Sequence, residues 1–107
     1  MNSKDIVTPG SFNSIIIYRT KDNSADYKFD IQPHSGDGYR IYIESQPSYN
    51  GRDSGGHPTH RYTDSAGRRY ICWPHRISSY EKAKEITATW SECTQKYIRT
   101  GTEFKDQ

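Results

Sequence analysis

One cysteine of this sequence lies among side chains that could take part in chemistry with it. Cys72 is part of the tetrapeptide Ile-Cys-Trp-Pro, at the point where a run of strand-favouring residues ends. A thiol at such a junction can act as a nucleophile when a neighbouring side chain orients or deprotonates it. His60, Asp64 and His75 are close enough in sequence to be that neighbour. Cys72 is therefore a candidate nucleophile, and the alternative is a core cysteine packed beside Trp73.

The histidines allow two other kinds of site. His57, His60 and His75 could supply the base and the acid of a metal-independent ribonuclease. With Asp53 as a further ligand they could hold zinc, although Pro58 makes a helix between His57 and His60 unexpected. The plainer interpretation of each histidine is a solvated loop residue. We expect neither a metal nor a cofactor.

The second cysteine belongs to a predicted helix near the C-terminal end of the sequence. Apolar side chains at steps of three and four residues form one stripe: Ala83, Ile86, Trp90, Cys93 and Tyr97. This spacing is typical of an amphipathic helix, so we expect Cys93 to be buried as a small apolar residue. Ser78 and Glu81 have the spacing of a capping box at its start, and Gly101 suits a left-handed end.

Three runs with the character of strands precede this helix. Residues 14–19 are rich in β-branched and aromatic side chains, and residues 26–32 and 39–45 alternate apolar and polar side chains. That alternation is the period of a half-buried strand, and the turn-forming residues between the runs predict an antiparallel meander. Residues 46–58 are expected to be irregular, and a loop this long in a small domain is more often functional than idle.

Two shorter runs complete the expected fold. Residues 60–63 and 69–72 flank an Asp-Ser-Ala-Gly turn and are expected to pair as a hairpin. The sequence therefore predicts an α+β domain, in which an antiparallel sheet of four to five strands carries a C-terminal helix packed on it. We expect this single domain to span residues 12–104 and residues 1–11 to form a flexible tail.

The composition agrees with a sheet and excludes several classes of protein. The 107 residues contain no leucine, eleven isoleucines and nine tyrosines, which favours strands and excludes a helical bundle. No run approaches the roughly 20 apolar residues that a membrane span requires. The N-terminal residues lack the pattern of a secretion signal, and two cysteines are too few for a disulfide scaffold. We therefore expect a cytoplasmic protein with both thiols reduced.

The order of these parts points to a known family. A meander and a proline-containing loop are followed by His-Pro at 57–58, Ile-Cys at 71–72, and a helix with Trp90 that ends in Tyr-Ile-Arg-Thr-Gly at 97–101. This order resembles the ubiquitin-conjugating enzyme fold. It is most similar to the compact bacterial members found in antiphage operons, some of them beside cyclic-oligonucleotide synthases. The resemblance covers about residues 12–104.

The resemblance implies a chemistry for Cys72. Its thiolate would form a thioester with the C-terminus of a partner protein and pass the acyl group to an amine, or hold the partner covalently. His60, with His57 as the rival candidate, would match the histidine that shapes the active-site loop. The partner would be a protein with a conjugatable C-terminus, such as a nucleotidyltransferase encoded nearby. Where the family has an asparagine that stabilises an oxyanion, this sequence has Thr59.

Two other functions stay open at this point. One is a non-catalytic protein-interaction module of the same fold. The other is a small RNA-binding or ribonuclease protein that uses His57, His60 and His75. The formal net charge is only +2 and the basic residues are scattered, whereas nucleic-acid binders usually gather a stronger basic excess. We therefore do not expect a nucleic acid as a partner. We do not expect a membrane either, because the sequence has no long apolar run.

Overall fold

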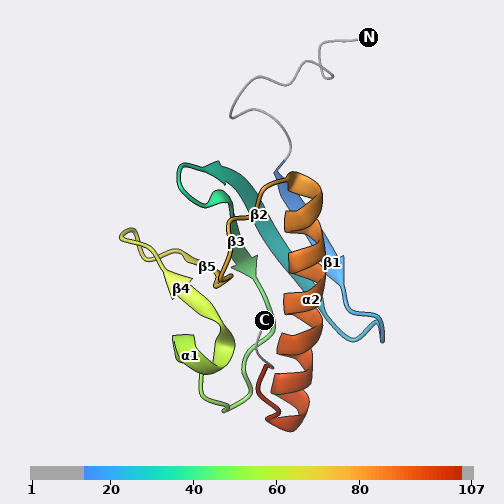
Figure 1. The fold of residues 1–107 in the computed structure, drawn as a ribbon. Helices are drawn as coiled ribbons and strands as arrows, with labels where there is room; N and C mark the ends of the chain where they lie inside the picture. Colours follow the sequence, from blue (N-terminus) through green and yellow to red (C-terminus); the bar gives the residue numbers. More distant parts are fainter. Residues whose placement is uncertain (1–13, 105–107) are drawn as a thin grey trace.

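A computed structural model describes residues 14–104, and the tail expected at residues 1–11 lies outside this described part. The elements in order are β1 (Ile15–Arg19), β2 (Asp26–His34), β3 (Gly38–Ser45), α1 (Gly56–Thr59), β4 (Arg61–Thr63), β5 (Arg69–Ile71) and α2 (Tyr80–Thr100). Helix α2 packs across β1, β2 and β3, while α1 and the β4–β5 hairpin lie to one side (Figure 1). The predicted α+β class, a sheet with a C-terminal helix on it, is confirmed.

The sheet has five strands in the order β1-β2-β3-β5-β4, and all neighbouring strands are antiparallel. The first three form the predicted meander, and the predicted hairpin is added to it through β5. Strand β2 runs two residues further than expected, through Pro33 to His34. Strands β1 and β4 are the two edges of the sheet. Within residues 14–104, no helix is both long and apolar enough to cross a bilayer.

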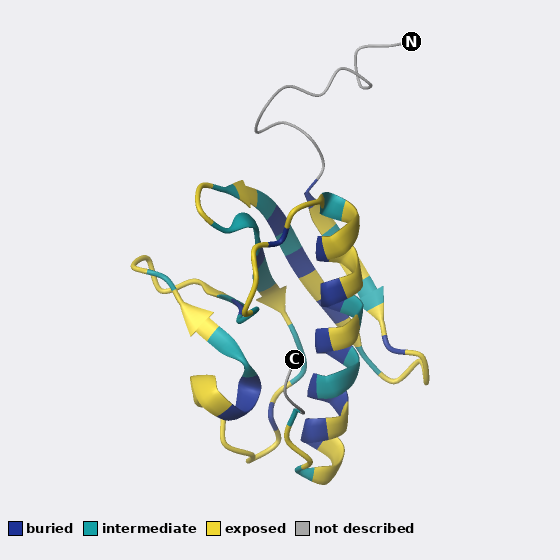
Figure 2. Cartoon of the chain, viewed as in Figure 1, coloured by how far each residue is buried: buried dark blue, intermediate teal, exposed yellow. Residues whose placement is uncertain are grey.

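The core lies between the sheet and α2. Tyr27, Phe29 and Ile31 alternate with polar residues along β2 and are fully buried on its helix-facing side. Trp90 of α2 meets the rings of Tyr27 and Phe29 edge-on, with centroids 6.0 and 5.9 Å apart. Figure 2 shows the buried side of α2 turned toward the sheet and its exposed side turned away. Burial of these aromatic side chains therefore holds the helix on the sheet.

Helix α2 begins one residue later than the expected capping box. The cap is Ser79, not Ser78: its backbone is extended, and its side chain accepts a hydrogen bond from the Lys82 amide at 3.0 Å. At the other end the Gly101 amide donates to the Tyr97 carbonyl at 2.8 Å, and Gly101 has a φ of 76°. The predicted glycine end is confirmed, because this backbone conformation favours a residue without a Cβ.

The buried side of α2 is more polar than the apolar stripe predicted. Thr87, Ser91 and Thr94 are as buried as Trp90, whereas Cys93 is only half-buried. The expectation that Cys93 is a core residue was wrong, because it lies at the flank of the buried face, beside Thr94. Partial burial still raises the pKa of its thiol.

The loop expected at residues 46–58 contains a helical turn. Gly56–Thr59 form α1, which includes the buried Pro58. A proline is tolerated here because an amide in the first turn of a helix has no intrahelical acceptor to lose. The turn ends at His60, whose φ of 53° is left-handed. The expectation that Pro58 prevents a helix was therefore wrong, and this turn sets the direction in which His57 and His60 leave the backbone.

Candidate functional site

The register of the β4–β5 hairpin brings Cys72 and His60 together. Arg61 is paired with Ile71, so the residue before β4 lies opposite the residue after β5. The Cys72 amide donates a hydrogen bond to the His60 carbonyl at 2.8 Å. Two residues that are distant in sequence thus become neighbours at the end of the hairpin. Cys72 is half-buried there, which corresponds neither to a core cysteine nor to a fully exposed one.

A hollow of about 550 Å³ opens beside this pair. Its lining comes from α1, from the start of β4, from the end of β5 and from the segment after α2: Gly56, His57, His60, Arg61, Tyr62, Cys72, Glu103 and Phe104. The structure therefore brings the three site residues predicted from the sequence, Cys72, His60 and His57, to one cavity. His57 is exposed at its rim, and His60 is half-buried.

The ionisation of Tyr62 responds to the neighbouring thiol. A hydrogen bond between the Tyr62 hydroxyl and Cys72 raises the pKa of Tyr62 above its ordinary value, and the charge of the thiolate raises it further. The tyrosine is 53% exposed, so its hydroxyl and the sulfur meet where solvent and a ligand can reach them. A hydroxyl in this position can donate to the sulfur and hold the thiol side chain in one orientation.

Arg61 also lines this cavity, and contacts outside the cavity hold its guanidinium. Its guanidinium donates to the Ser54 carbonyl at 2.8 Å and lies 4.8 Å from the centre of the Tyr49 ring. Burial lowers its pKa, but an arginine remains charged at any physiological pH. These contacts anchor the guanidinium to the segment before α1, while the residue itself lines the cavity.

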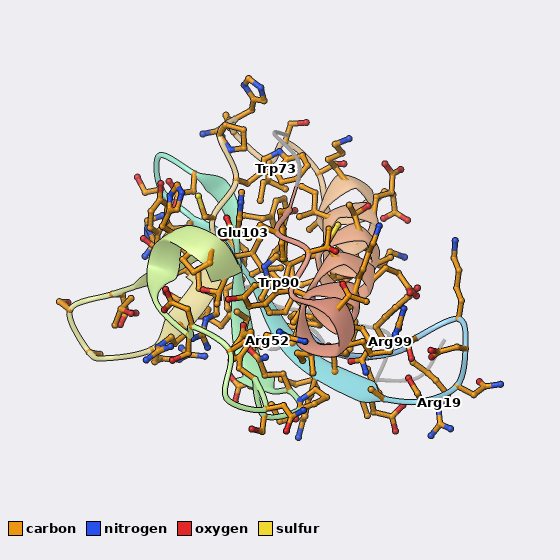
Figure 3. The ribbon with its side chains drawn as sticks, turned by 90° about the horizontal axis from the view of Figure 1, so that it is seen from below. Arg19, Arg52, Trp73, Trp90, Arg99 and Glu103 are labelled. Atoms are coloured by element: carbon orange, nitrogen blue, oxygen red, sulfur yellow. The ribbon has the colours of Figure 1, made fainter. Side chains whose placement is uncertain are left out.

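The segment after α2 closes one side of the hollow. It turns back along the helix and passes between α2 and the β4–β5 hairpin (Figure 1). The Phe104 ring stacks on the His60 imidazole, with centroids 4.6 Å apart and an interplanar angle of 8°. Figure 3 shows Glu103 in this region, between the hairpin side of the molecule and Trp90. Stacking on Phe104 therefore restricts the orientation of the histidine nearest the thiol.

Thr59 does not take the place of the asparagine that the resemblance leads one to expect. It is fully buried, and its hydroxyl donates to the Gly55 carbonyl at 2.6 Å. Its own carbonyl accepts from the Trp90 indole at 3.1 Å. Thr59 thus connects α1 to α2 and has no hydroxyl proton to offer in the cavity. An oxyanion there would have to be stabilised by other groups, such as Arg61.

The third histidine lies elsewhere. His75 lines a separate hollow, which Tyr62 divides from the one beside Cys72. A ribonuclease site built from all three histidines is therefore not assembled, although His57 and His60 still share a cavity. Among residues 14–104, no three His, Cys, Asp or Glu side chains come close enough to hold a metal ion. The zinc site considered above has no such group in the described part of the chain.

Sequence reasoning missed the roles of Tyr62, Arg61, Glu103 and Phe104. The predicted strand at residues 60–63 could have indicated Tyr62. Alternate residues of a strand lie on the same face, and Tyr62 is two residues from His60. No periodicity could have indicated Phe104, which follows the end of α2 and reaches His60 only through the fold.

No family model, curated protein or solved structure matches this chain.

Proposed function

We propose that Cys72 is a nucleophile that forms a thioester with the C-terminus of a partner protein. One observation carries this proposal: Cys72, His60 and His57 line the same cavity, and the Cys72 thiol is hydrogen-bonded to Tyr62 at its side. A nucleophilic cysteine needs access, an adjacent base or orienting group, and room for an acyl chain. The half-buried thiol, the stacked His60 and the volume of about 550 Å³ meet these three requirements.

The reaction is an acyl transfer in two steps. The Cys72 thiolate attacks the carbonyl carbon of an activated C-terminus, an acyl adenylate or a thioester, and the adenylate or thiol leaves with the electron pair of the broken bond. An amine then attacks the Cys72 thioester, loses a proton to a base such as His60, and releases the thiolate. Arg61 is the cationic lining residue that would stabilise the oxyanion of each tetrahedral intermediate, if its guanidinium turned from Ser54 toward the thiol. The bacterial antiphage setting remains part of the proposal that the resemblance supports.

Intact-mass spectrometry of the protein expressed with its genomic neighbours tests the proposal. We expect an added mass equal to a protein partner less one water, which reductant or hydroxylamine removes. Cys72→Ala should abolish the adduct. Cys72→Ser should convert it into an oxygen ester that survives reductant, because an ester is less reactive toward thiols than a thioester.

Cys93→Ala is the matched control, because it removes the other thiol of the chain without touching the cavity. This variant should retain the adduct. An adduct that moves to Cys93, or biological activity that persists in full after Cys72→Ala, would refute thioester chemistry at Cys72. The second outcome would favour the non-catalytic interaction module of the same fold.

A further inference from the structure

A second hollow lies on the other side of Tyr62. It has a volume of about 260 Å³ and is formed by the turn between β2 and β3, the β4–β5 hairpin and residues 73–77. Aromatic side chains supply much of its lining, among them Tyr62, Tyr70 and Trp73. This volume lies just below the range of about 300–1,000 Å³ for small-molecule sites, so the hollow suits a compact ligand or one part of a larger ligand. The proposed acyl transfer uses none of this hollow except Tyr62, on its border.

The tyrosines of this region form a row across the sheet. Tyr42 pairs with Tyr70, and Tyr70 pairs with Tyr62, so the three side chains project from the same face of β3, β5 and β4. Their ring centroids are 5.9 and 5.6 Å apart. Arginines already cover two of the rings: the Arg68 guanidinium lies 3.8 Å from the centre of Tyr42, and that of Arg40 lies 4.0 Å from Tyr70. Tyr62 at the end of the row is the exposed ring.

The charges around the hollow favour an anion. Arg40, His75 and Arg76 line it, together with one carboxylate, Asp37. Asp37 accepts two hydrogen bonds from Arg40, at 2.9 and 2.7 Å, so its charge is largely neutralised. Arg76 is exposed, and its guanidinium donates a hydrogen bond to the Gly36 carbonyl at 3.3 Å. A carbonyl is neutral, so this contact does not neutralise the positive charge of Arg76. The hollow thus combines aromatic rings with an excess of positive charge.

The backbone keeps the hollow in shape without a ligand. The Ile77 amide donates to the Asp37 carbonyl at 2.9 Å, which fastens residues 73–77 to the β2–β3 turn. Gly38 lies so close to this segment that a Cβ there would be 2.1 Å from the Ile77 carbonyl oxygen. Figure 3 shows Trp73, the first residue of this segment, near the start of α2. A preformed cavity loses less entropy when it binds a ligand than one that must first be ordered.

We propose that this second hollow binds a nucleotide. Its base stacks on the accessible rings of Tyr62 and Trp73, and its phosphate is bound by Arg76, His75 and Arg40. A purely apolar ligand would give the Arg76 charge no anionic partner, and inorganic phosphate alone would leave the rings exposed. The nucleotide can come from the free pool or belong to a single strand of RNA or DNA, since both present the same base and phosphate.

Fluorescence titration of the whole protein tests this inference. The chain has two tryptophans, and Trp90 is only 3% exposed, so quenching of the more accessible Trp73 reports on the hollow. Titrations with the four ribonucleoside monophosphates, the corresponding nucleosides, inorganic phosphate and short homopolymeric RNA and DNA strands separate the sources. We expect a nucleotide to bind and Arg76→Ala to weaken binding by at least about fivefold, the loss of one charge-assisted contact.

Arg19→Ala is the matched control, because this exposed arginine on β1 pairs with Asp26 and does not line the hollow. It should leave the affinity unchanged. Trp73→Phe should abolish the fluorescence signal but retain binding measured by calorimetry, since a phenyl ring still stacks on a base.

Binding of a mononucleotide assigns the site to free nucleotides, and binding of strands alone assigns it to single-stranded nucleic acid. The inference is overturned if none of these ligands binds, if phosphate alone binds as tightly as the nucleotides, or if Arg76→Ala and Arg19→Ala have equal effects.

Discussion

Tyr62 links the Cys72 cavity to the second hollow. The Tyr62 hydroxyl is hydrogen-bonded to the thiol and also stands on the border of the second hollow. His60 is held by different means, a stacking contact with Phe104 and a backbone hydrogen bond to Cys72. Each side chain near the sulfur therefore has its orientation set by a separate contact, so the cavity can keep its geometry while one of them is changed.

The raised pKa of Tyr62 leads to a prediction that concerns this one contact. Hydrogen bonding to Cys72 and the thiolate charge both disfavour the tyrosinate. In Cys72→Ala the pKa of Tyr62 should therefore fall toward the ordinary value of about 10. An NMR titration of the tyrosine ring resonances measures this shift, and Cys93→Ala should leave the Tyr62 resonance unchanged. An unaltered Tyr62 titration in Cys72→Ala would contradict the contact.

At the scale of the elements, α2 is the part whose ends and faces decide how the site is assembled. Ser79 caps the start of α2, and Gly101 at its C-terminal end lies close to the Arg52 side chain. In the middle of the helix, the Trp90 indole donates a hydrogen bond to the Thr59 carbonyl of α1. The Arg52 side chain donates to the carbonyls of Ile98 and Arg99, at 3.3 and 3.1 Å, which ties the loop before α1 to the helix terminus (Figure 3). These contacts position the loop that leads into α1, and thereby His57.

The position of the helix cap can be tested with two adjacent serines. Ser79→Ala removes the acceptor of the Lys82 amide and should lower the free energy of unfolding by about 1 kcal/mol. Ser78→Ala changes an exposed residue outside the helix and should alter it by less than about 0.5 kcal/mol. Urea denaturation of both variants gives the two values. If Ser78→Ala were the more destabilising variant, the helix would begin with the capping box expected from the sequence.

The strands and the helix could be predicted from the sequence because their patterns are local. Alternation along β2 and the spacing of Ala83, Ile86 and Trp90 each depend on a few neighbouring residues, and the fold buries these side chains as expected. The sequence placed the capping serine at residue 78 instead of 79, and it placed Cys93 in the buried face, where the structure has the adjacent Thr94. Sequence patterns specify a helix face more sharply than its exact ends or flanks.

The candidate site was predicted only in part, because its contacts join distant parts of the chain. Cys72, His60 and His57 could be named from residue types and from a resemblance. The stacking of Phe104 on His60 depends on the path of the chain after α2, and the assignment of His75 to another hollow depends on residues 73–77 turning toward β3. No local pattern contains this information.

For the whole molecule, a polar contact attaches α2 to the edge of the sheet. The Tyr18 hydroxyl of β1 donates to the Glu92 carboxylate of α2 at 2.5 Å, and the Lys21 amide donates to the same carboxylate at 2.9 Å. One acidic side chain thus joins the first strand, the turn after it and the helix. The contact raises the pKa of Tyr18 to about 12.

This contact predicts a loss of stability at alkaline pH. Tyr18 is protonated in both the folded and the unfolded chain below pH 10, so its contribution is complete there. Between pH 10 and about 12 only the unfolded chain loses the proton, and the contribution therefore declines as the pH rises. Tyr18→Phe should be less stable than the wild type by about 0.5–1 kcal/mol at pH 8, and the difference should shrink above pH 10.

Chemical denaturation at a series of pH values measures both effects. Glu92→Gln is the companion variant, because removal of the carboxylate charge should return the pKa of Tyr18 toward 10. Identical stability curves for the wild type and Tyr18→Phe from pH 8 to the alkaline limit would show that the hydroxyl contributes nothing.

The order of the strands and α2 along the chain has a consequence for biosynthesis. The side of β2 that bears Tyr27, Phe29 and Ile31 is covered by α2, which the ribosome makes after all five strands. A nascent chain can pair β1, β2 and β3 early, but their apolar face stays in contact with water until α2 emerges. During this interval the growing chain exposes aromatic surface to its neighbours. A chaperone that covers this face until α2 has been made therefore favours a high yield of folded protein.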